Sequence, residues 1–183
     1  YEEGTGSVLR SSVPDTKNIG GYTAYVVEYA QGDKEYYTSD SIGLTLYGVY
    51  LVEPEYTGDI FFNSPLLLAP SNAALGSPEY VSNSSYPLTV YVYPYGYVTV
   101  TVDITARTNI LAMEDVTTQN RVLRDCIKVS VQMTQVIRES GEVFESETTY
   151  YWFYKGVGVV KQTDSLTSVT IKESLVNGVS ATY

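Results

Sequence analysis

The chain has 183 residues, no histidine and one cysteine, and its 21 acidic and 11 basic side chains give a net charge of −10. The missing histidines exclude Ser-His-Asp triads, Cys-His pairs and His-ligated metals. One cysteine excludes an internal disulfide, a CxxC redox pair and a thiolate zinc cluster. Because an acidic chain is repelled by phosphate backbones, we predict no nucleic-acid partner.

The composition predicts a single all-β domain. Hydrophobic residues make up 44% of the chain, charged residues 17%, and there are 19 tyrosines beside many Thr, Ser and Val. Branched and aromatic side chains suit a pleated, half-buried surface. Residues 1–20 are rich in Gly, Ser, Thr and Asp without a sustained period, which predicts a flexible N-terminal lead-in. Residues 21–183 are then the β domain.

The first predicted strands cover residues 22–30 and 34–38, joined by a turn at residues 31–34. A longer strand follows over residues 41–53. Its two faces are both fairly apolar, which predicts that this strand is covered on both sides.

Residues 54–86 differ from the rest of the chain. They hold four prolines and clusters of Ser and Asn, with one short strand predicted at residues 59–63. Proline removes a ladder donor, so this segment is excluded from a central hairpin. The apolar run at residues 65–70, which includes three consecutive leucines, must be buried, but it is far too short for a membrane helix of roughly 20 residues. We therefore expect no transmembrane segment, and a segment that covers an opening of the core.

The clearest hairpin has residues 87–93 and 97–107 as its arms and Pro94, Tyr95 and Gly96 as its turn. The second arm alternates apolar and polar side chains, as in a half-buried antiparallel strand. Residues 109–115 fit either a helical turn or another extended piece.

Further alternation predicts strands at residues 122–138, 143–154, 159–163 and 166–176, with the sheet ending at Asn177 and Gly178. About eight to ten antiparallel strands in neighbour order predict a curved meander, either a half-barrel or an up-and-down barrel. A two-sheet β-sandwich is the alternative.

Reactive groups are sparse. Cys126 is interpreted as a small buried hydrophobe rather than a reactive thiol. The carboxylates that could share a concave face, Asp103, Glu145 and Glu147, are interpreted as solvated strand residues, since no spacing selects a pair. We predict no catalytic residue, no metal site and no cofactor.

The tyrosines are the most informative feature. Four of them surround the turn at residues 94–96, and residues 150–154 are all aromatic. A strand of this kind is aromatic on both faces, so one face fills the core while the other packs on a second layer, lines a cavity or is exposed. Core packing and cross-strand pairing are the alternative to a ligand site. The candidate ligand-binding residues are Tyr91, Tyr93, Tyr151, Trp152 and Phe153.

Residues 115–175 resemble a loose group of bacterial envelope proteins and lipoproteins, many of them uncharacterised. In that group a strand ends in a phrase such as Tyr-Ala-Lys-Gly-Val-Gly-Leu-Val-Lys, and residues 150–161 read YYWFYKGVGVVK. A second phrase of the group is degraded here: Arg121 and Leu123 replace its Gly and Phe. The resemblance implies a curved sheet similar to lipoprotein-carrier half-barrels, and it implies no reaction.

Low lysine content and an acidic pI, with many Tyr, Thr and Ser, are typical of an exported bacterial protein of the periplasm or cell surface. We expect a non-enzymatic protein that binds a lipid, acyl chain or other amphipathic ligand in the concave face of the sheet, under residues 54–86. The alternative is a structural or adhesive surface domain that binds a protein or glycan, and a weaker alternative is a carboxylate-dependent glycosidase. A lipid anchor on the N-terminus of a precursor stays open, as does the oligomeric state.

Overall fold

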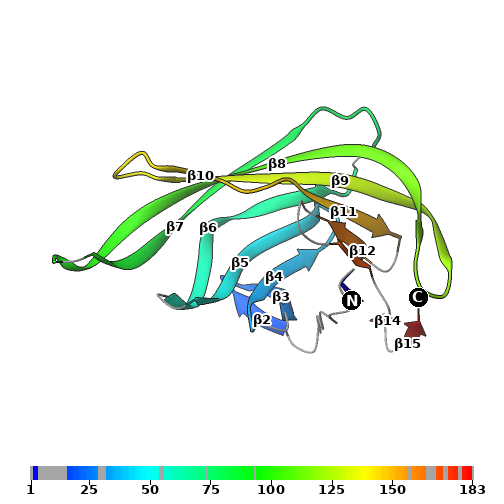
Figure 1. Ribbon diagram of the computed structural model, residues 1–183, viewed down its shortest axis with the longest axis horizontal. Helices are drawn as coiled ribbons and strands as arrows, with labels where there is room; N and C mark the ends of the chain where they lie inside the picture. The colour runs from blue at the N-terminus through cyan, green and yellow to red at the C-terminus, as the bar shows by residue number, and fades with distance from the viewer. Residues whose placement is uncertain are drawn as a thin grey trace.

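We analysed a computed structural model of the chain, in which the regular elements are all β-strands (Figure 1). The structure describes residues 2–3, 16–28, 32–53, 56–72, 74–92, 94–155, 158–163, 168–170, 173–176 and 179–182. The strands are β1 (Glu2–Glu3), β2 (Thr16–Ile19), β3 (Tyr22–Glu28), β4 (Lys34–Ser39), β5 (Gly43–Glu53), β6 (Tyr56–Pro70), β7 (Tyr80–Val92), β8 (Gly96–Thr117), β9 (Val122–Ile137), β10 (Val143–Glu145), β11 (Thr149–Tyr154), β12 (Gly158–Thr163), β13 (Ser168–Thr170), β14 (Glu173–Val176) and β15 (Val179–Thr182).

The strands form two main antiparallel sheets, so the predicted all-β class is confirmed, and the arrangement is consistent with both the curved meander and the two-sheet sandwich. The larger sheet has the order β1-β13-β12-β11-β9-β8-β7, with β10 also paired to β9, and the smaller has the order β2-β3-β4-β5-β6. Neither order closes into a barrel in the described part of the chain. In Figure 1 the larger sheet arches over the smaller one, and the turn of the β7–β8 hairpin reaches out beyond the other strands.

The main core lies between the two sheets. Leu46, Ile60 and Leu66 from β5 and β6 belong to one buried cluster with residues of β7, β8 and β9. Val102 and Ile104 of β8 are each 3% exposed, because every second residue of this strand faces the core. The opposite side chains of β7, β8 and β9 form the outer face of the larger sheet.

Strand β5 is buried on both faces, as its sequence predicts. Leu46 belongs to the main core, and its neighbour Tyr47 belongs to a separate cluster on the other face of the smaller sheet. Because both faces of β5 are covered, apolar and polar residues do not alternate along its sequence.

Two β-bulges interrupt the pairing of β8 with β9, one at Ile110–Ala112 and one at Glu114–Val116. Bulges bend a strand and increase its twist. The β8–β9 hairpin accordingly curls downward at the right of Figure 1. A third cluster of buried residues lies in this part of the larger sheet and contains Val116, Leu123, Cys126, Trp152 and Val160.

The prediction of a single short strand in residues 54–86 was wrong, whereas their exclusion from a central hairpin agrees with the placement of β6 and β7 in different sheets. Most of this segment is regular strand, since it contains all of β6 and the first half of β7. Pro65 is tolerated because residues 62–65 have no register partner in β5, where the pairing jumps from Leu46–Leu66 to Gly48–Phe61. The missing N–H of Pro65 therefore costs no ladder hydrogen bond. The expected burial of the leucine run is confirmed, with Leu66 at 0% and Leu68 at 4% exposure.

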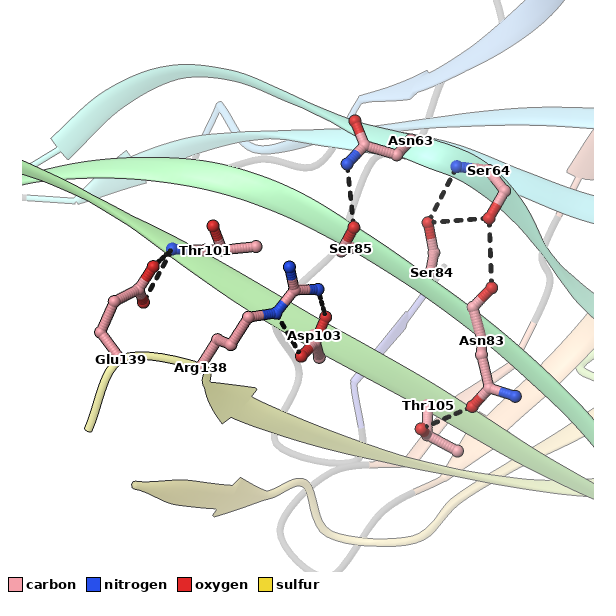
Figure 2. A network of polar contacts seen from close by, with 10 residues as sticks. All are labelled: Asn63, Ser64, Asn83, Ser84, Ser85, Thr101, Asp103, Thr105, Arg138 and Glu139. Atoms are coloured by element: carbon pink, nitrogen blue, oxygen red, sulfur yellow. Dashed lines mark hydrogen bonds and ion pairs between the residues drawn. The ribbon is translucent and has the colours of Figure 1, made fainter. Parts of the chain in front are cut away.

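Strands β6 and β7 meet along a seam joined by side chains. The backbone N–H of Ser64 donates to Ser84 Oγ at 3.0 Å, and that of Leu67 donates to Ser82 Oγ at 3.1 Å. Asn63 Nδ2 adds a 2.8 Å bond to Ser85 Oγ (Figure 2). These hydroxyls satisfy edge groups that a continuous sheet would pair with backbone.

Smaller corrections concern where the strands begin and end. The smaller sheet begins at Thr16 rather than near residue 22, since β2 pairs with β3, and Glu2–Glu3 pairs with β13. Residues 4–15 of the expected lead-in lie outside the described residues. Residues 109–115 are extended within β8 and not helical. The predicted strand 143–154 is divided into β10 and β11, and β14 and β15 form a hairpin where the sheet was expected to end.

Candidate functional site

The five residues predicted to bind a ligand do not form one site. Tyr151 and Phe153 lie on the inner face of β11 with ring centroids 6.2 Å apart, and both pack against the main core. Trp152 points to the outer face, where it is 4% exposed in the third cluster. Tyr91 lies at the far end of the hairpin β7–β8, and Tyr93 lies outside the described residues. Whether these residues bind a ligand stays a prediction.

Trp152 is held by charged neighbours on three adjacent strands. Lys128 and Lys161 are its register partners in β9 and β12, and their Nζ atoms lie 4.7 and 4.5 Å from a ring centre of the indole. The indole Nε1–H donates to Glu114 Oε1 at 2.5 Å. These cation–π contacts and the hydrogen bond account for a buried indole whose donor is satisfied.

The tip of the β7–β8 hairpin carries the most exposed aromatic side chains of the described residues. Tyr91, Tyr95 and Tyr97 are 62%, 81% and 80% exposed. Tyr91 and Tyr97 are cross-strand partners whose rings meet edge to face, with centroids 5.4 Å apart. The turn residue Gly96 has φ +85°, a conformation that favours glycine, and its position brings the tyrosines to both sides of the turn.

Polar side chains continue from these tyrosines along the outer face of β7 and β8. Thr89 and Thr99 are cross-strand partners with hydroxyl oxygens 2.9 Å apart. The next polar positions on this face are Thr101, Asp103 and Thr105 of β8, with Ser85 and Asn83 of β7 opposite the last two. We call this set the hairpin strip: Asn83, Ser85, Thr89, Tyr91, Tyr97, Thr99, Thr101, Asp103 and Thr105.

Figure 2 shows how the polar end of the hairpin strip is held. Arg138 forms a two-point contact with Asp103, and its Nε lies 3.0 Å from Asp103 Oδ2. The Glu139 carboxylate accepts the Thr101 backbone N–H at 3.0 Å through both oxygens. The Thr105 hydroxyl donates to Asn83 Oδ1 at 2.7 Å. Asp103, Asn83 and Thr105 each have a hydrogen-bond partner, so these side chains are oriented before a ligand binds.

Asp103 is the one carboxylate among the strip residues, although the chain is strongly acidic. Residues 80–102 contain no charged side chain. At the end of this stretch, the hydrogen bond from Arg138 holds the pKa of Asp103 below its usual value, and the pKa of Arg138 is raised in return. The opposite charges of Asp103 and Arg138 therefore cancel each other. The Glu139 carboxylate beside Thr101 adds one negative charge, so the strip carries few charges for a chain of net charge −10.

Three further features concern the carboxylates, the cysteine and possible metal ligands of the described residues. Among the candidate carboxylates, the hydrogen bond from Arg138 lowers the pKa of Asp103, the opposite direction from that of a glycosidase's general acid. Cys126 is fully buried, and burial raises the pKa of its thiol, so it fits the predicted role of a small core residue. No group of three or more candidate metal ligands occurs in the described ranges, and no helix there is long and apolar enough to cross a membrane.

Sequence reasoning named Tyr91 as a ligand residue and predicted the alternation of the second arm, but it did not join Tyr97 and the polar side chains of the two arms into one site. Thr, Ser and Asn at alternate positions are typical of an ordinary solvated face, and only the pairing register places Asn83 beside Thr105. The absence of charge between Glu79 and Asp103 was the available signal.

Comparison with known proteins gave no further guide, because no family model, curated protein or solved structure matches the chain.

Proposed function

We propose that this protein is a non-enzymatic structural or adhesive surface domain that attaches to another molecule through the tip of the β7–β8 hairpin. The observation that carries this proposal is the exposure of Tyr91, Tyr95 and Tyr97 at 62–81% on a hairpin that extends beyond the other strands (Figure 1). Tyrosine offers a large contact area with few rotatable bonds, so it loses little conformational entropy on binding. Interfaces are enriched in exposed rings of this kind.

The proposal extends to location. The acidic, tyrosine-rich composition and the phrase at residues 150–161 support an exported protein of the bacterial envelope. In that setting a protruding hairpin could reach a neighbouring protein or a glycan.

The test compares sedimentation of the labelled protein with bacterial envelope fragments. The variant Tyr91→Ser/Tyr95→Ser/Tyr97→Ser removes the exposed rings, and we expect its binding to fall at least about tenfold, because each ring lost removes about 0.5–1.5 kcal/mol or more of contact. Tyr25→Ser is the matched control, since Tyr25 is 51% exposed on β3 of the other sheet. Circular dichroism checks that each variant is folded. Equal binding by the triple variant and the wild type would refute the proposal.

A lipid or acyl ligand in the concave face is the second candidate. It is favoured by the partly buried hydrophobic residues around the main core, such as Tyr151, Phe153 and Met133 on the inner face. Against it, β5 and β6 cover this face with Leu46, Ile60 and other core residues. Native mass spectrometry of protein from its own host tests this candidate: a co-purified lipid supports it, and its loss in Phe153→Ala would place the lipid there.

A further inference from the structure

We propose that the hairpin strip binds an uncharged polysaccharide, with Tyr91 and Tyr97 as the stacking platform and the polar side chains beside them as hydrogen-bonding partners. This inference rests on the proposed attachment function and names the class of partner. A sugar ring combines an apolar C–H face with a rim of hydroxyls, so its recognition needs an exposed aromatic ring and hydrogen-bonding side chains within reach of each other.

The strip supplies both kinds of group on one face of one hairpin. Tyr97 is 80% exposed, and its cross-strand contact with Tyr91 at 70° between ring planes fixes its orientation while leaving ring surface accessible. Two residues further along β8, at roughly 6.8 Å in an extended strand, the Thr99 hydroxyl follows, paired with Thr89. The aromatic and the hydrogen-bonding parts of the strip are therefore contiguous.

The polar part is built so that binding orders few side chains. Asp103 is held by Arg138 on one side, and Asn83 accepts from the Thr105 hydroxyl on the other (Figure 2). A carboxylate and an amide that are already oriented retain further acceptor and donor positions. Immobilised polar groups of this kind reduce the entropy lost when a hydroxyl-rich ligand binds.

Charge selects a neutral glycan over an anionic one. The chain has a net charge of −10, so a uronic-acid or sulfated polymer is repelled at long range. The strip has no charged side chain between Glu79 and Asp103, Asp103 is paired with Arg138, and the Glu139 carboxylate beside Thr101 adds one negative charge. It therefore offers no unpaired cation to an anionic sugar and little repulsion to a neutral one.

The same observations favour a glycan over a protein partner. The centre of a protein interface is dominated by apolar side chains, with polar groups at its rim. In the strip the aromatic rings lie at one end, and hydroxyl, amide and paired carboxylate groups occupy the remaining length. Hydrogen-bonding groups along the whole strip match a polymer that carries hydroxyls along its whole length.

The first experiment measures binding of the full chain to soluble β-glucan, α-mannan, xylan and galactan by affinity electrophoresis and calorimetry, with a sulfated glycan as the anionic probe. Tyr97→Ser should weaken binding about tenfold or more, because it removes the stacking ring. Tyr97→Phe keeps the ring and should bind nearly as well as the wild type. Tyr25→Ser is the control for loss of an exposed tyrosine elsewhere, and Asn83→Ala tests the hydrogen-bonding part without touching the aromatic platform.

A second arm uses the envelope fragments of the attachment test after two treatments. Periodate, which oxidises sugar diols, should abolish sedimentation of the wild type, whereas protease treatment should leave it intact. The inference is overturned if the wild type binds none of the neutral glycans, binds the sulfated glycan instead, or binds them equally well after Tyr97→Ser. Protease-sensitive, periodate-resistant binding that still needs the tip tyrosines would overturn the glycan inference and leave the attachment function standing. If substitution of the tip tyrosines left binding to the envelope fragments unchanged, both the glycan inference and the attachment function would be overturned.

Discussion

The contact between Lys17 and Asp59 offers a stability test that is independent of any ligand. Lys17 lies in β2 and Asp59 in β6, which are the two edge strands of the smaller sheet, yet their side chains meet at 2.7 Å. The Tyr36 hydroxyl, from the central strand β4, also donates to Asp59. The smaller sheet must therefore curve so that its two edge strands approach each other on the face that carries Tyr36 and Tyr47. The three side chains hold the edges together beside this buried cluster.

The magnitude of the effect follows from the number and exposure of these hydrogen bonds. A hydrogen bond to a charged group contributes about 1.5–3 kcal/mol when well shielded. The side chains of Lys17 and Asp59 are 37% and 33% exposed, so solvent screening reduces the ionic part. We expect Asp59→Asn to lower the free energy of unfolding by about 2 kcal/mol at pH 7, with about 1 kcal/mol of this coupled to Lys17.

The shifted pKa of Asp59 determines how its contribution to stability changes with pH. Burial raises the pKa of Asp59, but the hydrogen bonds from Lys17 and Tyr36 and the charge of Lys17 outweigh burial, so the pKa is lowered overall. The native state therefore binds fewer protons than the unfolded chain, whose aspartate pKa is about 3.9. The stability from Asp59 is present above that unfolded value and is lost as the pH falls through the lower native one.

Urea unfolding followed by far-UV circular dichroism, from pH 7 down to the acid limit of folding, checks this prediction. Wild type, Asp59→Asn, Lys17→Met and the double variant form a double-mutant cycle. The difference in free energy of unfolding between the wild type and Asp59→Asn should become smaller as Asp59 becomes protonated. Equal urea midpoints at pH 7, or a difference that stays constant into acid, would refute the reasoning.

Four further predictions concern the packing. Burial, and then the hydrogen bond and charge of Asp59, raise the pKa of Tyr36. The stability that the protonated Tyr36 hydroxyl contributes is therefore present below the unfolded pKa of about 10 and is lost as the pH rises through the native pKa. In an absorbance titration, Tyr36→Phe should remove one phenol that ionises late. Leu66→Ala should cost about 2–5 kcal/mol in urea unfolding, because Leu66 is fully buried. Gly48→Ala should cost about 1–3 kcal/mol or more, since its Cβ would lie 2.3 Å from the Ile60 carbonyl oxygen, and a cost near zero would show that β6 yields there. Glu114→Gln should lower stability by about 1 kcal/mol through the lost charge on the Trp152 hydrogen bond, measured by fluorescence-detected unfolding.

Sequence periodicity predicted the part of the fold in which one strand face is buried and the other is solvated. In β8, Val102, Ile104 and Ala106 are buried in alternation with Asp103 and Thr105, so the period of two was visible in the sequence. Alternation fails where both faces are covered. The aromatic run at residues 150–154 predicted that the second face of β11 packs on a layer, lines a cavity or is exposed. It did not predict the bulges in the pairing of β8 with β9, or that Trp152 would be buried with Val116 on the outer face.

The candidate site was only partly predictable for a related reason. The turn at Gly96 and the tyrosines around it follow from local sequence, because turn chemistry and strand propensity are local properties. The contact of Asp103 with Arg138 joins residues 35 positions apart. Side chains this far apart in the chain are brought together by the register of β8 with β9, which no local pattern encodes.

The prolines of β6 and β7 lie on edge strands, where the chain passes from one sheet to the other, and they show how the prediction for residues 54–86 went wrong. Pro87 is opposite Thr101 in the β7–β8 pair. The N–H and carbonyl of Thr101 bond to Glu139 and Arg138, on the side away from β7, so Pro87 and Thr101 form a non-hydrogen-bonded pair. The backbone nitrogen of Pro87 therefore faces away from β8, and it has no hydrogen to donate. Pro65 lies between Ser64 and Leu67, whose N–H groups turn to serine hydroxyls of β7. Proline does not prevent β6 or β7 from being strands, because both are edge strands of their sheets, where a missing N–H is tolerated. Side-chain bonds then replace the ladder, and the β7–β8 hairpin is free to extend past the smaller sheet with its outer face uncovered.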